Sequence, residues 1–269
     1  MNYGADNLWK PLKSVILAKP EYYSIPEPIN QWQEKFRGTE DRELARSQHE
    51  GLVRTLKDNG VQCHFLEPVK GATEQKDVRD IGIISSKGAI AGHFAKDIRM
   101  GEVASFILFC VENKIPLLKY GIPFEGGDLF LVDEEHCYIG SGKRSSTRPN
   151  ELESLLNRKV HIVHHISSHH LDAIFNFARP DLIVLHPKYI AEEEIVKGKD
   201  VIEMDDNDIW LMSANFLLLD KDKVLADSQC KRINNELSKR GIEVVEIDVS
   251  ELKKNGGSIR CMTLPLLRE

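Results

Sequence analysis

Long apolar runs are missing from this chain of 269 residues. The longest largely apolar stretch, Ala104 to Val111, is interrupted at Glu112 and is far shorter than the roughly 20 residues that a membrane-spanning helix needs. The N-terminal stretch, MNYGADNLWKPLK, lacks the apolar core of a signal peptide. We therefore expect no membrane span and a cytoplasmic location.

Cysteine pairs and basic runs are missing as well. The five cysteines, at positions 63, 110, 137, 230 and 261, are odd in number and widely spaced, and no C-x-x-C occurs, which favours reduced thiols over a disulfide framework. The net charge is −6 and no Lys/Arg cluster occurs, which argues against nucleic acid as a partner. Neither G-x-x-x-x-G-K-[ST] nor G-x-G-x-x-G is present, so we expect no nucleotide cofactor.

The overall composition is that of an ordinary globular protein, with 41% hydrophobic and 29% charged residues. The chain is long enough to bury a real core, and no linker or low-complexity segment divides it, so we expect one domain over residues 1–269. The stretch Tyr22 to Gly38, with Pro26 and Pro28, resembles a loop and is a candidate lid.

One supersecondary pattern recurs along the chain: a hairpin of two strands, a helix and a third strand. The hairpins are expected at 78–91, 128–142, 171–186 and 209–225, the helices at 99–113, 150–158, 191–196 and 228–240, and the third strands at 116–120, 160–165, 201–204 and 242–247. Unit starts near 80, 128, 171, 209 and 257 give a period of about 45 residues, typical of a repeat architecture.

The fifth unit is divided between the two ends of the chain. The strand after Cys261 should pair with Leu12 to Ala18, followed by a helix at Arg42 to Asn59 and a strand at Val61 to Leu66. Joining the ends closes a ring and removes the exposed edges of an open array. The prediction is an α/β propeller of five ββαβ units; the alternative, an open α/β sheet, would begin its units with single strands.

Residues that can do chemistry stand at the starts of these units: Asp80, Glu125 with Asp128, His170 with Asp172, and Cys261. Equivalent points of a cyclic repeat converge on one axis, so these residues should share one site. Each also has a plainer interpretation. A single cysteine is often a small core residue, Glu125-Gly126-Gly127-Asp128 is compatible with a simple tight turn, and Asp80 beside Arg79 with a surface ion pair.

Cys261 and His170 are the candidates for the reacting groups. Gly256-Gly257 would let the backbone before Cys261 approach a ligand closely, and a nearby cation would favour the thiolate. His170 ends a tract of five histidines that begins at His161, a pattern compatible with zinc, but tetrahedral zinc sites need tighter ligand pairing, so we expect no metal. If residues 170–172 are extended, His170 and Asp172 point to the same side.

The ordered set of motifs resembles the guanidino-modifying enzymes of the pentein fold: arginine deiminases, arginine dihydrolases, dimethylarginine dimethylaminohydrolases and amidinotransferases. Its segments in chain order are Val78-Arg79-Asp80, Arg99-Met100-Gly101-Glu102, Phe124-Glu125-Gly126-Gly127-Asp128, Ile139-Gly140 to Arg144, His170-Leu171-Asp172, Ser213-Ala214-Asn215 and Gly256-Gly257-x-x-x-Cys261-Met262-Thr263. The resemblance covers nearly the whole chain. Arg260 departs from the resemblance, because deiminases often have histidine at that position. Dihydrolases differ from this chain by an asparagine near the position of Asp80.

The resemblance implies a role for each candidate. Cys261 would be the nucleophile, His170 the general acid and base, and Glu125 a further catalytic group that, with Asp80 and Asp172, grips the substrate guanidinium. Arg99 and Arg144 would hold the substrate carboxylate, and no cofactor is needed. The expected activity is hydrolysis of arginine or a close derivative through a covalent thiouronium, giving citrulline and ammonia, or an amine from a methylated arginine. An amidinotransferase is the alternative, and a ribosome-binding protein of the same fold a weaker one. Arginine, methylated arginine, agmatine and guanidinoacetate all stay open as substrates, as does the oligomeric state, a homodimer included.

Overall fold

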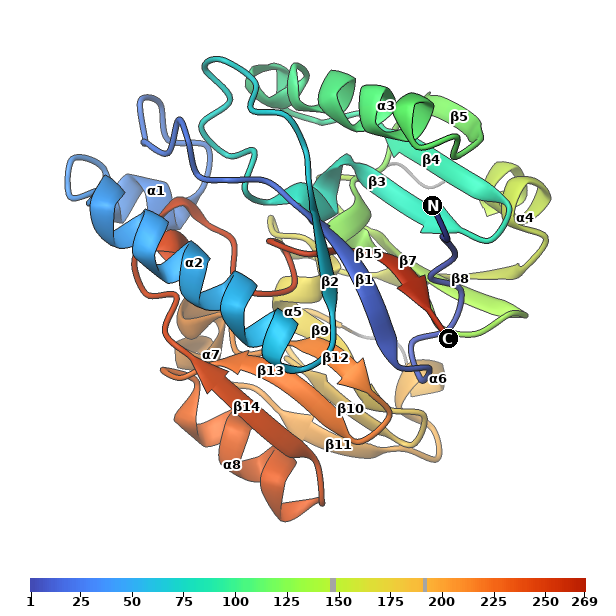
Figure 1. Cartoon of the computed structure of the whole chain (residues 1–269). Coiled ribbons are helices and arrows are strands. Elements are labelled where there is room, and N and C mark those ends of the chain that lie inside the picture. Colours follow the sequence, from blue (N-terminus) through green and yellow to red (C-terminus); the bar gives the residue numbers. More distant parts are fainter. Residues whose placement is uncertain (146–148, 191–192) are drawn as a thin grey trace.

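The computed structural model describes residues 1–145, 149–190 and 193–269, and within them fifteen strands form five three-stranded sheets around a pseudo-fivefold axis (Figure 1). In every sheet the first strand is antiparallel to the second, and the second, in the middle, is parallel to the third. This is the arrangement that a hairpin followed by a helical crossover produces. The expected α/β propeller of five ββαβ units is confirmed.

The strands fall into three sets by their place in the sheet. The first strands are β3 (Gly82–Ser85), β6 (Leu129–Leu131), β9 (Phe175–Arg179), β12 (Leu217–Asp220) and β15 (Leu264–Arg268). The middle strands are β4 (Gly88–Gly92), β7 (His136–Ser141), β10 (Leu182–Leu185), β13 (Lys223–Asp227) and β1 (Leu12–Leu17). The third strands are β5 (Leu117–Ile122), β8 (Lys159–His164), β11 (Asp200–Glu203), β14 (Glu243–Ile247) and β2 (Gln62–Phe65).

Burial distinguishes the inner from the outer edge of each sheet. The first strands are almost wholly buried, as in the Gly-Ile-Ile-Ser of β3, whereas third strands such as β2 and β5 are half-exposed. Apolar residues fill the spaces between neighbouring sheets in clusters, one of which joins the phenylalanines of β6 and β9. The inner strands therefore surround the axis, and the segments just before them all lie near it.

The ends of the chain close the ring. β1, from the N-terminal part, pairs antiparallel with the C-terminal β15 and parallel with β2, so the two termini contribute to one sheet (Figure 1). Val15 faces Pro265 and Ile16 faces Leu264 in this pairing. The predicted split of the fifth unit is confirmed.

At least one α-helix follows each middle strand and lies outside the sheets (Figure 1), and two further α-helices precede first strands. The α-helices within the described residues are α1 (Gln31–Phe36), α2 (Arg42–Asp58), α3 (Glu102–Glu112), α4 (Pro149–Leu156), α5 (Leu171–Ile174), α6 (Glu193–Val196), α7 (Asp206–Leu211) and α8 (Lys231–Lys239). The helix expected at 191–196 begins in residues outside the described part. Among the described residues, no helix has the length and apolar content required to cross a lipid bilayer.

The sequence prediction was wrong about how three units begin. Before β3 the chain forms a 3₁₀ turn (η1, Val78–Ile81), before β9 it forms α5, and residues 206–211 form α7 ahead of β12. Residues 170–172 are therefore not extended throughout: His170 is extended but Leu171 and Asp172 are helical. The side chain of Asp128 accepts the Leu171 N–H at 2.6 Å, which favours a helix start there.

Candidate active site

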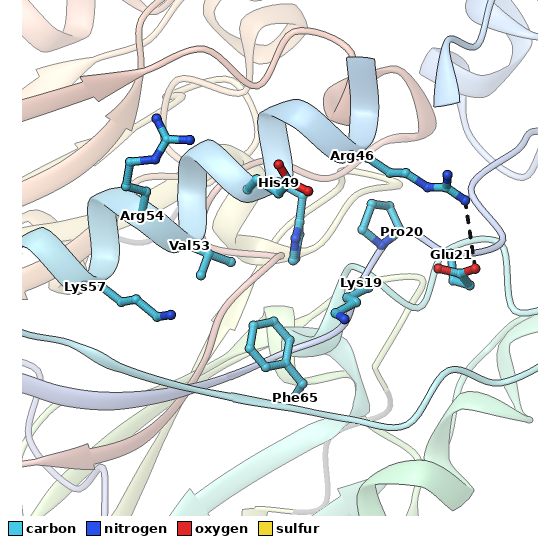
Figure 2. Close-up of a pocket in the computed structure, with 10 residues that line it drawn as sticks. Lys19, Pro20, Glu21, Arg46, His49, Val53, Arg54, Lys57 and Phe65 are labelled. Carbon is cyan, nitrogen blue, oxygen red and sulfur yellow. Dashed lines mark ion pairs between the residues drawn. The ribbon is translucent and has the colours of Figure 1, made fainter. Parts of the chain in front are cut away.

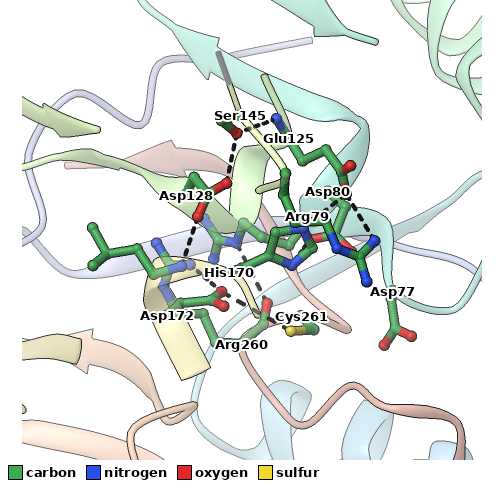
Figure 3. A network of polar contacts seen from close by, with 12 residues as sticks. Asp77, Arg79, Asp80, Glu125, Asp128, Ser145, His170, Asp172, Arg260 and Cys261 are labelled. Carbon is green, nitrogen blue, oxygen red and sulfur yellow. Dashed lines mark hydrogen bonds and ion pairs between the residues drawn. The ribbon is translucent and has the colours of Figure 1, made fainter. Parts of the chain in front are cut away.

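A cavity of about 480 Å³ lies where the segments before the inner strands meet. Cys261, His170, Asp80 and Asp172 all line it, although they come from units far apart in the sequence (Figure 3). Asp80 lies on η1, Asp172 on α5 and His170 immediately before α5, while Cys261 lies in the turn that leads into β15. The arrangement brings together a nucleophile, an acid–base group and two carboxylates.

A larger cavity, of about 990 Å³, lies between α2 and the ends of β1 and β2 (Figure 2). Its lining includes Lys19, Arg54, Lys57 and Phe65, but no cysteine. Its one histidine, His49, is buried, and burial lowers the pKa of His49 to about 4. No cysteine stands beside a histidine in this lining, so the smaller cavity is the candidate active site.

His170 is held between two carboxylates. Its Nε2 lies 2.7 Å from Oε2 of Glu125, and its Nδ1 lies 3.4 Å from Oδ1 of Asp80. Burial alone would lower the pKa of His170, but the charges of Asp80 and Glu125 outweigh it and raise the pKa to about 10. Glu125 shows the reverse: burial raises its pKa, but His170 outweighs burial and brings it to about 2. The pair is therefore an imidazolium with a carboxylate at neutral pH.

Gly127 explains why the turn before β6 contains glycine. A Cβ atom at this position would lie 2.8 Å from Oδ1 of Asp80 and 2.9 Å from Cγ of His170. Such distances are too short for a carbon, so any side chain here would displace the imidazole or the carboxylate. The absence of a side chain permits the contact between His170 and Asp80.

Cys261 is buried and is held by Asn215. The Asn215 amide donates a hydrogen bond from Nδ2 to Sγ of Cys261 at 3.2 Å, and its Oδ1 accepts the Cys261 N–H at 3.1 Å. Burial raises the pKa of the Cys261 thiol well above its ordinary value, and the charges of Asp172 and Asp80 raise it further. The free site therefore holds a thiol that needs an added positive charge to ionise.

Two buried carboxylate oxygens in the cavity accept no hydrogen bond among the described residues: Oδ1 of Asp80, which has only the 3.4 Å ion-pair contact with His170, and Oδ1 of Asp172. The other oxygen of each is occupied, because Oδ2 of Asp80 accepts from Arg99 at 2.6 Å and Oδ2 of Asp172 accepts from Arg260 at 2.5 Å. Sγ of Cys261 lies 4.0 Å from Oδ2 of Asp172. A buried unpartnered acceptor is costly, so the cavity is suited to a ligand that carries N–H donors.

Glu125 and Arg99 have partners that the sequence prediction did not assign. Both Glu125 oxygens are occupied, Oε1 by the Ala95 N–H at 2.9 Å and Oε2 by His170, and Glu125 is not among the residues that line the cavity. The Arg99 guanidinium is buried and donates to Glu102 from Nε at 3.1 Å and from Nη2 at 2.9 Å. Because its Nη1 holds Asp80, few Arg99 donors are left for a substrate carboxylate.

Arg144 is the more open of the two predicted arginines. It lines the cavity, its side chain is 11% exposed, and its Nη1 lies 3.8 Å from Oε2 of Glu125. Asn30 and Trp32, from the candidate lid stretch, line the cavity too. That stretch contains α1, which is held against the segment before Cys261 by bonds from Asn30 and Gln33 to the carbonyl of Asn255.

Asp128 lies behind the cavity. Its Oδ1 accepts the Leu171 N–H and its Oδ2 accepts the Ser145 hydroxyl at 2.5 Å, so it bonds one backbone and one side-chain donor (Figure 3). Ser145 in turn accepts the Glu125 N–H at 3.0 Å. Asp128 thereby links the turn that carries Glu125 to the helix that carries Asp172.

One cluster in the described residues has the spacing of a metal site. Ligand atoms of Asp80, Glu125 and His170 lie within 4.8 Å of one another. Both ring nitrogens of His170 already face carboxylates, and a protonated imidazole accounts for this spacing. The expectation that no metal is needed stays a prediction.

Two cavity residues were missed by the sequence prediction of the site. The sequence marks Asn215 only as part of a motif, although it stands before β12 as the other site residues stand before their inner strands. That equivalent position was the signal that could have identified it. Asp77, whose carboxylate accepts two bonds of 2.8 Å from the buried Lys76 ammonium, also lines the cavity. No motif pointed to Asp77.

Known proteins resemble the chain over nearly its whole length. The sequence model of the family described as N,N dimethylarginine dimethylhydrolase, eukaryotic, matches residues 19–268. An uncharacterized protein of Bacillus subtilis, YkgA, is 32% identical over 96% of this chain and 92% of its own length. The N(G),N(G)-dimethylarginine dimethylaminohydrolase of Mycobacterium tuberculosis is 24% identical over 93% of this chain and 84% of its own.

A solved structure has the same architecture. The N-terminal domain of ArgZ, an arginine dihydrolase of cyanobacteria crystallised with its product, superposes with a TM-score of 0.87 at 22% identity and covers 95% of this chain and 97% of that one. At this identity the likeness establishes the pentein fold. The family match and the fold agree with the motif order along the sequence. The chain belongs to the N,N dimethylarginine dimethylhydrolase family, within the pentein superfamily of guanidino-modifying enzymes.

Proposed function

We propose that this protein is a cysteine-dependent hydrolase of the guanidinium group of L-arginine or a close derivative. The observation that carries the proposal is the pair of buried carboxylate oxygens without a hydrogen bond, on Asp80 and Asp172, in residues that line one cavity with Cys261. A guanidinium is planar, stays cationic and presents N–H groups in a fixed fork, so it satisfies two acceptors at once.

The substrate cation would also ionise the nucleophile. Burial, Asp172 and Asp80 all favour the neutral thiol of Cys261 in the empty site. A bound guanidinium would neutralise the two carboxylates and place a positive charge beside the sulfur, which lowers the thiol pKa. Asn215 would hold the thiolate through its N–H. Ionisation would then accompany binding, and the free thiol would be shielded from side reactions.

The covalent step follows from these positions. The Cys261 thiolate attacks the guanidinium carbon, and a C–S bond forms. The imidazolium of His170 gives its proton to the leaving nitrogen, the C–N bond breaks, and ammonia departs, or an amine if that nitrogen is methylated. Water then loses one proton to the neutral His170 as it attacks the thiouronium, and the second leaves to solvent as the C–S bond breaks to return the thiolate and give citrulline. Glu125 would act on His170, by keeping it protonated.

The remainder of an arginine would extend toward Arg144. This guanidinium is the more open of the two arginines assigned to the substrate carboxylate, and it lies on the cavity wall beside Trp32 and Asn30. Arg99 would instead fix Asp80, because its donors bond Asp80 and Glu102. The family description supports methylated arginine, and the likeness to ArgZ supports arginine itself.

A panel assay tests this proposal. The protein is incubated with arginine, asymmetric dimethylarginine, agmatine and guanidinoacetate, and products are identified by mass spectrometry. Citrulline together with ammonia or dimethylamine, and an intact-protein adduct on Cys261 after acid quench, are the expected results. Turnover that requires an added amine acceptor would instead identify an amidinotransferase. No product and no adduct with any of the four would contradict an activity on guanidines.

A further inference from the structure

Arg79 and Arg260 occupy a place that the proposed chemistry does not use. Each directly precedes a site residue, Asp80 or Cys261, and both lie beside the active site (Figure 3). Together with Arg268, on β15, they line a third, small cavity, which is distinct from the one that contains Cys261. The first strands of the sheets that begin with β3, β6 and β15 enclose it, so it lies in the interior of the ring.

All three arginines are at least nine-tenths buried, with exposed fractions of 7%, 4% and 5% for Arg79, Arg260 and Arg268. Arg260 has a counter-charge, since its Nη1 donates to Asp172 at 2.5 Å. Arg268 donates only to backbone carbonyls, those of Leu8, Lys10 and Leu218. No carboxylate among the described residues forms an ion pair with Arg79 or Arg268.

Hydrogen-bond donors are left over as well. Nε of Arg268 is buried and has no partner in the described part of the chain. Arg79 donates from Nε to the carbonyl of Arg260 at 3.4 Å, and this is the one hydrogen bond of its side chain within the described ranges. A native protein seldom leaves such a buried donor unsatisfied, so Nε of Arg268 indicates a missing water or ion.

The positive charge of the arginines favours an ion over a water as the missing partner. Burial, and after it the charge of Arg260, lower the pKa of Arg268 to about 9, and the same two causes lower the pKa of Arg79. A water would fill the donors but leave this accumulation of positive charge in place. An anion would fill them and compensate the charge, which is the larger effect in a buried region.

We propose that the cavity lined by Arg79, Arg260 and Arg268 binds a small monovalent anion of halide size. The other side chains of the lining are apolar, with those of Ile83, Leu131 and Leu264 among them, and offer no acceptor or donor for the body of an organic acid. The Arg260 guanidinium is also fixed, with its Cζ 3.9 Å from the centre of the Phe130 ring. The site therefore provides guanidinium N–H donors around a narrow space, which suits a spherical ion.

Bromide tests the proposal directly, because it replaces chloride and scatters anomalously. Crystals of the whole protein grown without halide are soaked in sodium bromide, and data are collected at the bromine absorption edge. An anomalous peak in the cavity within bonding distance of Nε of Arg268 is expected. Thermal unfolding is measured in parallel in sodium chloride and in sodium gluconate at equal ionic strength, and chloride should raise the Tm by about 2–4 °C and then saturate.

Two variants distinguish anion binding in this cavity from general effects of salt on the Tm. Arg268→Gln should abolish both the bromide peak and the chloride dependence of the Tm. Arg158→Gln is the matched control, because Arg158 is also buried but is paired with Asp6, and its loss should lower the Tm while the chloride dependence persists. A cavity without a bromide peak, equal Tm values in chloride and gluconate, or a peak that survives Arg268→Gln would overturn the proposal. Should Arg268→Gln fail to fold, the two measurements on the unaltered protein still decide.

Discussion

Nε2 of His170 lies 2.7 Å from Oε2 of Glu125, and this contact determines the charge of the site. The carboxylate has no exposed surface on its side chain, and the imidazole is 12% exposed, so water screens the pair little. A protonated His170 can supply a proton to a leaving nitrogen, but it cannot accept one from a thiol. In the proposed reaction Cys261 would therefore ionise by another route, which is the charge of the bound guanidinium.

Replacing Glu125 by glutamine should move the pH profile of the reaction. Glu125 and Asp80 raise the pKa of His170 to about 10, so loss of one carboxylate must lower that pKa. The general acid is the protonated form, and the alkaline limb of kcat should shift toward neutral pH by about one unit or more. Glu134→Gln, at a surface carboxylate bonded to Lys10, is the control that should leave the profile unchanged. An identical alkaline limb in Glu125→Gln would show that His170 is not the group that titrates.

Cys261→Ser should abolish turnover and keep the fold. A serine hydroxyl is a far poorer nucleophile without a strong base, and His170 is protonated, so the loss in kcat should exceed about 10³-fold. Cys230→Ser is the matched control, because Cys230 is also buried, but its thiol bonds the carbonyl of Leu211 and the residue does not line the cavity. Near-normal activity in Cys261→Ser would contradict the assignment of Cys261 as the nucleophile. An inactive Cys230→Ser variant with an unchanged Tm would contradict it as well.

Asn215→Ala should slow the reaction of Cys261 with alkylating reagents. The Asn215 amide donates to Sγ at 3.2 Å and so favours the thiolate, which means that its loss should raise the thiol pKa. The measurement is the rate of iodoacetamide alkylation against pH, whose midpoint should move to higher pH. Asn176→Ala is the control, since that buried amide bonds the carbonyls of Ala214 and Phe216 on either side of Asn215 and not the sulfur. Equal alkylation profiles for the unaltered protein and Asn215→Ala would remove Asn215 from the site.

Local pattern along the sequence was sufficient to predict the fold. The alternation of hairpin and helix repeats with a regular period, and each strand is long enough to show its burial, so the pairing of β1 with β15 could be inferred from the sequence alone. The conformations of the turns that carry the site residues could not be predicted from this pattern. A 3₁₀ turn of four residues, as at Val78–Ile81, is too short to produce a periodic signal, and its geometry depends on bonds to distant segments. The Asp128 bond to Leu171, across 43 positions, is one such bond, at the turn before α5.

The candidate site was predictable as a set of residues but not as a set of contacts. Cys261, His170, Asp80 and Asp172 were expected to meet because equivalent positions in a ring converge, and they line one cavity. Whether a carboxylate oxygen is free for a ligand depends on which protein groups already bond that carboxylate. Arg99 bonds Asp80 and Ala95 bonds Glu125, and neither pairing follows from spacing along the chain.

Activity should be independent of metal. Asp80, Glu125 and His170 have ligand atoms within 4.8 Å of one another, but the proton on His170 already balances the carboxylates. Dialysis against EDTA should leave kcat and KM unchanged, and metal analysis of the active protein should find less than about one equivalent in ten. Loss of activity on chelation that zinc or manganese restores would show that the cluster is a metal centre.

The two carboxylates with free oxygens should each contribute strongly to substrate binding. Asp80→Asn and Asp172→Asn each remove a charge-assisted hydrogen bond worth about 1.5–3 kcal/mol, so kcat/KM for the preferred guanidine should fall more than about ten-fold in each. The double variant should lose less than the product of the two losses, because both groups act on one planar cation.

Asp128→Asn is the internal control for these losses. Asp128 bonds the Leu171 N–H and the Ser145 hydroxyl and does not line the cavity, so its amide variant should lower the Tm while KM changes little. Kinetics and thermal melts of the four proteins are measured together. If Asp172→Asn keeps full activity on arginine, Asp172 does not bind the substrate guanidinium. A site that binds methylated arginine without that acid then becomes the better interpretation. If Asp128→Asn loses as much kcat/KM as Asp80→Asn without a change in Tm, the division between binding and supporting carboxylates is wrong.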